Sequence, residues 1–173
     1  MTEVKKIYLA AGCFWGSQAY FKRIDGIKQV VAGYANGQTE HTNYQRVAET
    51  DHAEAVEVSY DSTQINLTSI LAHYFRMIDP LSLNKQGGDT GRQYRTGIYY
   101  TEQQQEKITK AYMEAEQTKY TKPIQVELDP LKNFIIAEEY HQDYLAKHPQ
   151  GYCHINLSLA DEKINLPEIN IVK

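Results

Sequence analysis

Residues 6–16, KIYLAAGCFWG, contain the change of pattern that decides the fold. The apolar run before Gly12 is typical of a short buried strand. From Cys13 to Ile24 the apolar side chains instead recur at the spacing of a helix. The stretch therefore predicts a strand that passes directly into a helix, with Cys13 at the junction.

Outward from this junction, the sequence continues with alternating strand and helix patterns. A long polar loop is expected at 35–51, and Asn66 can cap a helix that Asp79-Pro80 ends. A second long loop, at 81–96, is rich in glycine, and a loop of that length in a compact domain is usually functional. The main elements expected in chain order are strands at 6–11, 30–34, 53–60 and 97–100, with helices at 13–24 and 67–78.

The order strand, helix, strand, strand, helix, strand is that of a split βαβ arrangement. We therefore expect an α+β protein, a ferredoxin-like two-layer sandwich with a mixed sheet and helices on one face. Additions expected after this unit are an exposed helix at 102–120, a strand at 124–128, a final helix at 137–147 and a long coil tail. The length predicts one domain, residues 1–173, with a core of about 5–147 and a tail at 148–173.

Charge and composition exclude several classes of partner. The formal net charge is -4 and the Lys and Arg residues are dispersed, so there is no basic patch for nucleic acid or an anionic membrane. No apolar run reaches membrane-spanning length, and the first residues show no signal-peptide pattern. We expect a cytoplasmic monomer that binds neither nucleic acid nor membrane.

Two cysteines, Cys13 and Cys153, are too few for a disulfide scaffold and lack C-x-x-C spacing. At the first turn of a helix, unpaired N–H groups and the helix dipole would lower the pKa of the Cys13 thiol. A buried structural cysteine is the alternative, but the flanking Gly12 and Gly16 and two aromatic neighbours favour a reactive thiol. Cys153, unremarkable alone, could then displace hydroxide from a sulfenic acid on Cys13.

Glu54 is the candidate acid. Strand alternation places it on the same face as Val56, Val58 and Tyr60, so its carboxyl points to the apolar side. Burial there would raise its pKa and keep it protonated near neutral pH, as a general acid requires. The alternative is a strand-end glutamate that turns to solvent or pairs with a lysine.

Metal and phosphate sites have weaker support. His52 and Glu54 have the His-x-Glu spacing of zinc deaminases, but the Pro-Cys-x-x-Cys that completes that signature is absent. The other histidines do not repeat at ligand spacing, so no metal is expected. The glycine-rich stretch at 87–91 lacks the lysine of a phosphate loop and is better explained as a loop that places Asp89 and Tyr94.

These motifs make the chain similar to the type A peptide methionine sulfoxide reductases, from about Ile7 to His154. The family's signature of a catalytic cysteine and an aromatic pocket is matched by Gly12-Cys13-Phe14-Trp15-Gly16. Further matches follow in order: Gly33-Tyr34, Asn43-Tyr44, His52-Ala53-Glu54-Ala55-Val56, Gly88-Asp89, Gly91, Gln93-Tyr94-Arg95, Tyr140-His141-Gln142, Tyr144-Leu145 and Gly151-Tyr152-Cys153.

The resemblance implies a single catalytic domain that reduces methionine (S)-sulfoxide, free or in proteins, to methionine. Cys13 would attack the sulfoxide sulfur while Glu54 protonates its oxygen, helped by the hydroxyls of Tyr44 and Tyr94. This agrees with the roles inferred from the residues themselves, since a sulfoxide is a poor electrophile until its oxygen is protonated.

The resemblance also implies the rest of the site and the reductant. Phe14 and Trp15 would hold the S-methyl group of the substrate, and Asp89 would shape the site through hydrogen bonds. Cys153 would resolve the sulfenic acid left on Cys13 as a disulfide, which thioredoxin or another dithiol would then reduce. No bound cofactor is implied.

The chain departs from the family pattern at several positions. Asn36 replaces a usual glycine, Ala48 replaces a common cysteine, and residues 78–81 are Ile-Asp-Pro-Leu where many members have His-Asp-Pro-Thr. No cysteine follows Cys153, so thioredoxin would attack the disulfide directly. Two rival functions are a binding module for oxidised methionine, which needs no cysteine pair, and a thiol peroxidase or redox sensor, which needs no aromatic pocket.

Overall fold

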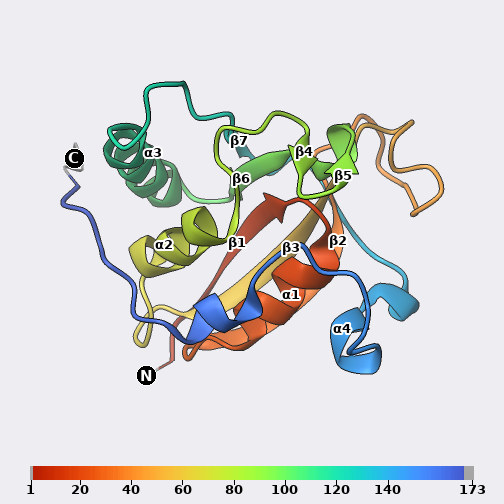
Figure 1. The fold of residues 1–173 in the computed structure, drawn as a ribbon, viewed down its shortest axis with the longest axis horizontal. Helices are drawn as coiled ribbons and strands as arrows, with labels where there is room; N and C mark the ends of the chain where they lie inside the picture. Colours follow the sequence, from red (N-terminus) through yellow and green to blue (C-terminus); the bar gives the residue numbers. More distant parts are fainter. Residues whose placement is uncertain (1, 170–173) are drawn as a thin grey trace.

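The computed structural model describes residues 2–169, so residues 170–173 of the predicted tail lie outside the described part of the chain. No helix within the described residues is long and apolar enough to cross a membrane. The elements (Figure 1) are β1 (Val4–Ala11), α1 (Phe14–Lys22), β2 (Ile27–Ala35), β3 (Ala53–Asp61), α2 (Leu67–Met77), β4 (Lys85–Gln86), β5 (Asp89–Thr90), β6 (Thr96–Tyr100), α3 (Gln103–Gln117), β7 (Glu127–Pro130), β8 (Phe134–Ile136) and α4 (Tyr144–Lys147).

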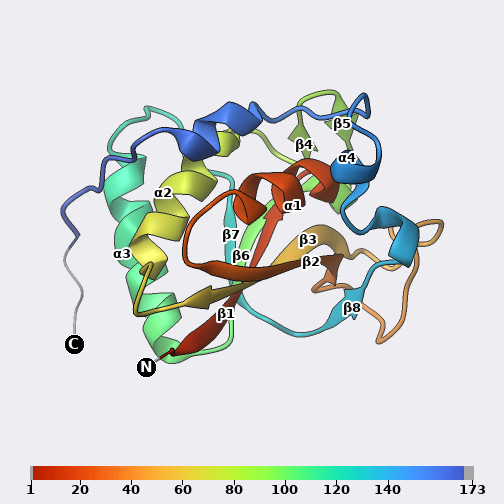
Figure 2. The same cartoon turned by 90° about the horizontal axis from the view of Figure 1, so that it is seen from below.

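β3 lies between β1 and β2 in the sheet, which is the split βαβ arrangement that the sequence predicts. The six-stranded sheet has the order β7-β6-β1-β3-β2-β8, and its neighbouring strands are antiparallel except for β6 and β7. Figures 1 and 2 show α1 and α2 on one face of this sheet. The α+β, ferredoxin-like sandwich is therefore confirmed, with β4 and β5 as a small separate hairpin inside the predicted loop.

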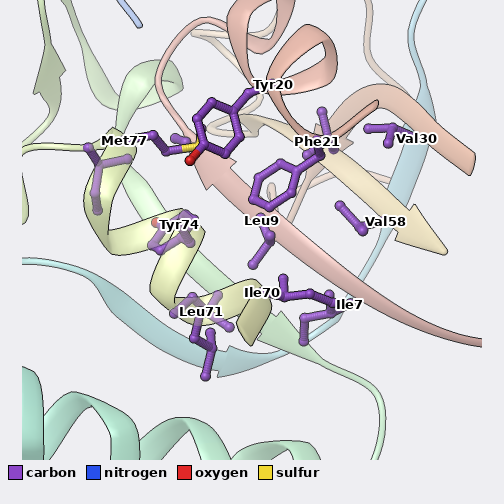
Figure 3. Packing of buried hydrophobic residues seen from close by; sticks show 14 of the residues in the cluster. Ile7, Leu9, Tyr20, Phe21, Val30, Val58, Ile70, Leu71, Tyr74 and Met77 are labelled. Atoms are coloured by element: carbon purple, nitrogen blue, oxygen red, sulfur yellow. The ribbon is translucent and has the colours of Figure 1, made fainter. Parts of the chain in front are cut away.

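The main core fills the space between the sheet and helices α1 and α2 (Figure 3). In β3, Val56 and Val58 point into this core, whereas Ala53 and Ala55 point to the opposite face. Each fully buried aliphatic or Phe side chain contributes about 1.5–3 kcal/mol relative to exposure. The largest fully buried side chains include Ile7, Leu9, Tyr20, Phe21, Ile70, Leu71 and Tyr74. This alternation directs Glu54 to the side of the sheet that the helices cover.

The predicted helix at 137–147 is wrong. The chain first forms β8 at the edge of the sheet, then a 3₁₀ turn at Glu139–His141 and the short α4. Asp143 adopts a left-handed conformation (φ 53°), through which a right-handed helix does not continue. Gln142 accepts from the Ala32 N–H at 3.0 Å and donates to the Ala32 carbonyl at 2.8 Å, so side-chain hydrogen bonds fix this segment to β2 instead.

Two smaller expectations also need correction. The helix expected to be exposed, α3, buries one face that includes Ala111 and Tyr112. The strand expected at 124–128 starts only at Glu127, because the backbone before it makes hydrogen bonds outside the sheet. The N–H of Ile124 donates to a side-chain oxygen of Gln117 at 2.9 Å, which ties this stretch to the end of α3.

The tail is mainly coil, with a 3₁₀ turn at Leu157–Asp161, and it crosses over α1 and α2 (Figures 1 and 2). Its side chains of Ile155 and Ala160 are buried against the core. Arg76 of α2 holds the later part of the tail by donating to the backbone carbonyls of Leu159, Glu162 and Lys163. The tail is therefore packed on the domain, with Cys153 on the segment that leads up to this anchor.

Candidate active site

Cys13 lies where β1 passes to α1, as the sequence predicts, and its side chain is buried. Gly12 makes the turn with φ +81°, a conformation that side chains rarely adopt. The expected lowering of the thiol pKa is wrong: burial raises it strongly, and the charge of Glu54 raises it further. The N–H of Trp15 lowers this pKa by less, so the helix terminus does not outweigh burial.

Glu54 is buried on β3 and its carboxyl reaches the first turn of α1. One carboxyl oxygen accepts from the Phe14 N–H at 3.2 Å, a donor that the helix itself leaves unpaired. Burial raises the pKa of Glu54 to about 8, this hydrogen bond opposes the rise, and the charge of Asp89 adds to it. Glu54 is therefore a neutral acid at pH 7, next in space to the residue that follows Cys13.

The protonation states of the Cys13 thiol and the Glu54 carboxyl are linked. The charged form of Glu54 raises the pKa of Cys13, but this contribution is present only above about pH 8, where Glu54 ionises. At neutral pH the site holds one proton on each group. Such a pair can deliver a proton to a bound oxygen while the sulfur attacks its neighbour.

Tyr44, which is exposed, and Tyr94, which is half-buried, come from two different loops, and both hydroxyls lie within electrostatic reach of Glu54 and Cys13. Burial raises the pKa of both hydroxyls, and in each case the charge of Glu54 is the next largest contribution. The charge of Cys13 contributes to both as well. Both hydroxyls therefore remain protonated and can donate hydrogen bonds at neutral pH.

An ion pair holds these two loops together. Arg92, in the 3₁₀ turn that carries Tyr94, donates to both carboxylate oxygens of Asp51 at 2.7 and 3.1 Å. Arg95 donates to the Asp51 carbonyl at 2.9 Å. Asp51 ends the loop that carries Tyr44 and has a left-handed backbone (φ 59°). The motif matches included Arg95 but gave no sign of Asp51.

Aromatic rings form the wall beside Cys13. The Trp15 indole N–H donates to Nδ1 of His141 at 3.0 Å, and its ring stacks on Tyr144 with centroids 3.7 Å apart. The His141 ring also lies 5.1 Å from Phe14 and 4.7 Å from Tyr44, centroid to centroid. His141 therefore lies at the centre of this wall. From the sequence, His141 was identified only as part of a motif match, and no role in the site was predicted for it.

Asp89 and Cys153 are the last two predicted site residues, and both lie within electrostatic reach of Cys13. The charge of Asp89 acts on Glu54 and Cys13, and its Oδ2 is buried without a hydrogen-bond partner among residues 2–169. The sulfur of Cys153 lies over α1, 3.0 Å from the point where a Cβ on Gly16 would sit. Both cysteines are free thiols. Within the described residues, no three His, Cys, Asp or Glu side chains gather as a metal site.

Two thiols at one helix turn, with a neutral carboxylic acid beside the first, can supply two electrons and a proton to a substrate. This arrangement defines a thiol-dependent oxidoreductase. The family model for peptide methionine sulfoxide reductase matches residues 5–170. The chain therefore belongs to the peptide methionine sulfoxide reductase family, whose enzymes reduce methionine sulfoxide with thiols. Membership of this family argues against the binding-module and thiol-peroxidase interpretations.

Solved structures agree with this assignment. Mxr1 from Saccharomyces cerevisiae in reduced form is 40% identical with a TM-score of 0.82, and the match covers 87% of this chain and 89% of that one. Methionine sulfoxide reductase A of Corynebacterium diphtheriae is 33% identical with a TM-score of 0.78, covering 87% and 77%. Mxr1 in complex with Trx2 matches at 30% identity and a TM-score of 0.61, covering 82% and 85%.

Proposed function

We propose that the chain reduces methionine (S)-sulfoxide, free or in proteins, to methionine, with Cys13 as nucleophile and Glu54 as acid. The observation that carries this proposal is the buried carboxyl of Glu54, one oxygen of which accepts from the N–H of Phe14, the residue after Cys13, at 3.2 Å. Burial raises the pKa of this carboxyl to about 8, so that it holds a proton at neutral pH. A thiol attacks a sulfoxide sulfur readily only when the sulfoxide oxygen receives a proton at the same time.

In the first half-reaction, Glu54 protonates the sulfoxide oxygen, and Tyr44 and Tyr94 donate hydrogen bonds to it. The Cys13 sulfur attacks the sulfoxide sulfur and forms a sulfur–sulfur bond. The hydroxyl group then passes from the substrate sulfur to the Cys13 sulfur, so that the substrate's sulfur–oxygen bond and the new sulfur–sulfur bond both break and methionine leaves. The oxygen ends on Cys13 as a sulfenic acid, and the thiol proton replaces the one that Glu54 gave. Cys13 is oxidised by two electrons and the sulfoxide is reduced by two.

The aromatic wall would bind the rest of the substrate. Phe14 and Trp15 supply an apolar surface for the S-methyl group, and the hydrogen bond from Trp15 to His141 fixes the indole plane. Burial lowers the pKa of His141, so this ring is neutral and accepts the indole proton at Nδ1. Asp89 would orient the substrate through hydrogen bonds to its buried, unpaired oxygen.

In the second half-reaction, the Cys153 sulfur attacks the Cys13 sulfur, the S–OH bond breaks, and the Cys153 proton leaves with the hydroxide as water. A Cys13–Cys153 disulfide results, and a dithiol reduces it. We propose thioredoxin as this dithiol, acting directly on the disulfide; the complex of Mxr1 with Trx2 supports this choice. No bound cofactor takes part in the cycle.

The proposal extends to the state of the protein. We propose one catalytic domain over residues 1–173, acting as a monomer in the cytoplasm. The dispersed charges and the net charge of -4 support a freely diffusing enzyme rather than one held at nucleic acid or a membrane surface.

A coupled assay tests the reaction as a whole. The protein is mixed with thioredoxin, thioredoxin reductase, NADPH and each methionine sulfoxide epimer in turn. We expect NADPH consumption with the S epimer and none above background with the R epimer. Consumption with peroxide alone, or binding of the sulfoxide without consumption, would favour the two rival functions.

A further inference from the structure

The tail segment around Cys153 presents its side chains to two different neighbours. The hydroxyl of Tyr152 accepts from the Gly88 N–H at 3.2 Å, so this side chain meets the β4–β5 hairpin that carries Asp89. Cys153 instead faces α1, close to Gly16. His154 returns to the hairpin, where its Cβ is 2.5 Å from the point at which a Cβ on Gly87 would sit. The two neighbours of Cys153 in the sequence, Tyr152 and His154, therefore both contact the β4–β5 hairpin.

The imidazole of His154 lies between Gly12 and Gly87, in a space that we call the His154 seat and that a side chain on either glycine would narrow. On the hairpin side is Gly87, with φ +59°. On the other side is Gly12, whose added Cβ would lie 2.7 Å from the Cβ of Gln86 and 3.2 Å from Cε1 of His154. Because Gly12 directly precedes Cys13, the ring touches the turn that holds the nucleophile. A flat ring fits between two residues that lack side chains, and a branched side chain needs more thickness.

The seat is also polar. Both ring nitrogens of His154 are buried without a hydrogen-bond partner among the residues described, and so is Oδ2 of Asp89. Burial lowers the pKa of His154, while the charge of Asp89 and the nearby backbone of Ala11 oppose this. The ring therefore lies within electrostatic reach of the Asp89 carboxylate, and the backbone group next to it has no well-aligned hydrogen bond to either ring nitrogen.

The hairpin is held more firmly than the tail segment. Gln86 on β4 accepts from the Asp79 N–H at 2.9 Å and donates to the Asp79 carbonyl at 2.8 Å. The segment from Tyr152 to His154 has one hydrogen bond to the hairpin, from Gly88. A change at His154 therefore displaces the tail and Cys153 before it displaces the hairpin and Asp89.

We propose that His154 is a positioning residue for the resolving step, seating the tail between Gly12 and Gly87 so that Cys153 faces the helix turn of Cys13. The inference rests on the proposed function, in which Cys153 resolves the sulfenic acid. His154 does not touch the sulfoxide in this scheme. Its effect falls on the rate at which the disulfide forms, since a misplacement of about 1 Å can cost on the order of 10²-fold in rate.

The test separates the two half-reactions. Reduced enzyme is mixed with excess methionine (S)-sulfoxide without thioredoxin, quenched at intervals, and analysed for methionine and for the Cys13–Cys153 disulfide. In His154→Leu we expect methionine to form near the parent rate and the disulfide to form about 10²-fold more slowly. His154→Asn, with a flat polar side chain, should recover most of the disulfide rate.

The control is His148→Leu, an exposed histidine in the same tail that stacks on Tyr144. It should leave both rates unchanged. A parental rate of disulfide formation in His154→Leu would overturn the inference, as would an equal loss of both steps, which indicates general damage to the site. If His154→Leu does not fold, Gly87→Ala takes its place, because the added Cβ would lie 2.5 Å from the Cβ of His154 and push the tail away. We expect this variant to form the disulfide more slowly than the parent, and a parental disulfide rate in it overturns the inference. Absence of any disulfide in the parent enzyme would instead contradict the proposed function.

Discussion

Glu54→Gln should lose sulfoxide reduction by about 10²–10⁴-fold, the usual contribution of a general acid, with little change in substrate affinity. The glutamine carbonyl can still accept from the Phe14 N–H, so the first turn of α1 keeps its partner. The amide has no acidic proton to give to the sulfoxide oxygen. Single-turnover formation of methionine at saturating sulfoxide measures the effect, and an undiminished rate in the variant would reject Glu54 as the acid.

The parent enzyme should show the matching pH dependence. Because the pKa of Glu54 is raised to about 8, the acid is protonated below that pH and lost above it. The rate of methionine formation should therefore fall as pH rises through about 8. In Glu54→Gln the small residual rate should lack this fall. A parent rate that rises across the same range would show that ionisation of Cys13, rather than protonation by Glu54, controls the step.

The same substitution should stabilise the fold at alkaline pH, which provides a control for folding. A carboxyl with a raised native pKa favours the native state below its unfolded pKa, near 4.5, and that contribution is lost as pH rises through about 8. Each pKa unit corresponds to about 1.4 kcal/mol. Glu54→Gln should therefore unfold at a higher temperature than the parent at pH 9 and at a similar temperature at pH 4, as followed by circular dichroism.

Strand alternation in the sequence was enough to predict where the Glu54 side chain lies. In β3 the period of two placed Glu54 with Val56 and Val58, and the structure buries all three on the helix-covered side. The prediction worked because the strand is central and its two faces differ. The periodicity near 137–147 failed because side-chain bonds from Gln142 to β2 and the left-handed Asp143, which no period reports, set the backbone there.

The prediction of a lowered pKa for the Cys13 thiol was wrong for a related reason, because long-range contacts that the sequence pattern does not show decide it. The helix terminus acts locally and can be inferred from the position of Cys13 after a strand, so the sequence predicted a lowered pKa. Burial and the charge of Glu54 depend on contacts between distant parts of the chain, and they dominate. The roles of Asp51 and His141 have the same origin, since each joins segments that are far apart in sequence.

Cys153→Ser should reduce one equivalent of sulfoxide per enzyme and then stop. The first half-reaction needs only Cys13 and an acid, so the burst of methionine should match that of the parent. Serine is close in size and can keep the hydrogen bond to the Ile155 carbonyl, which Cys153 donates to at 3.2 Å, so the tail should stay packed. Turnover with thioredoxin should fall by at least about 10²-fold, because an external thiol lacks the high effective concentration of an internal one.

Peptide mapping shows whether the two sulfurs meet during this cycle. After one turnover the parent should contain a Cys13–Cys153 linkage, which requires Cα atoms within about 7 Å, and Cys153→Ser should contain a Cys13 that reacts with sulfenic-acid probes. Cys13→Ser is the matched control and should form no methionine at all. An unlinked, sulfenic-reactive Cys13 in the parent would mean that an external thiol reduces the sulfenic acid directly and that Cys153 is a bystander. Arg76 anchors the tail beyond Cys153, so the movement that joins the sulfurs should be confined to residues before that anchor.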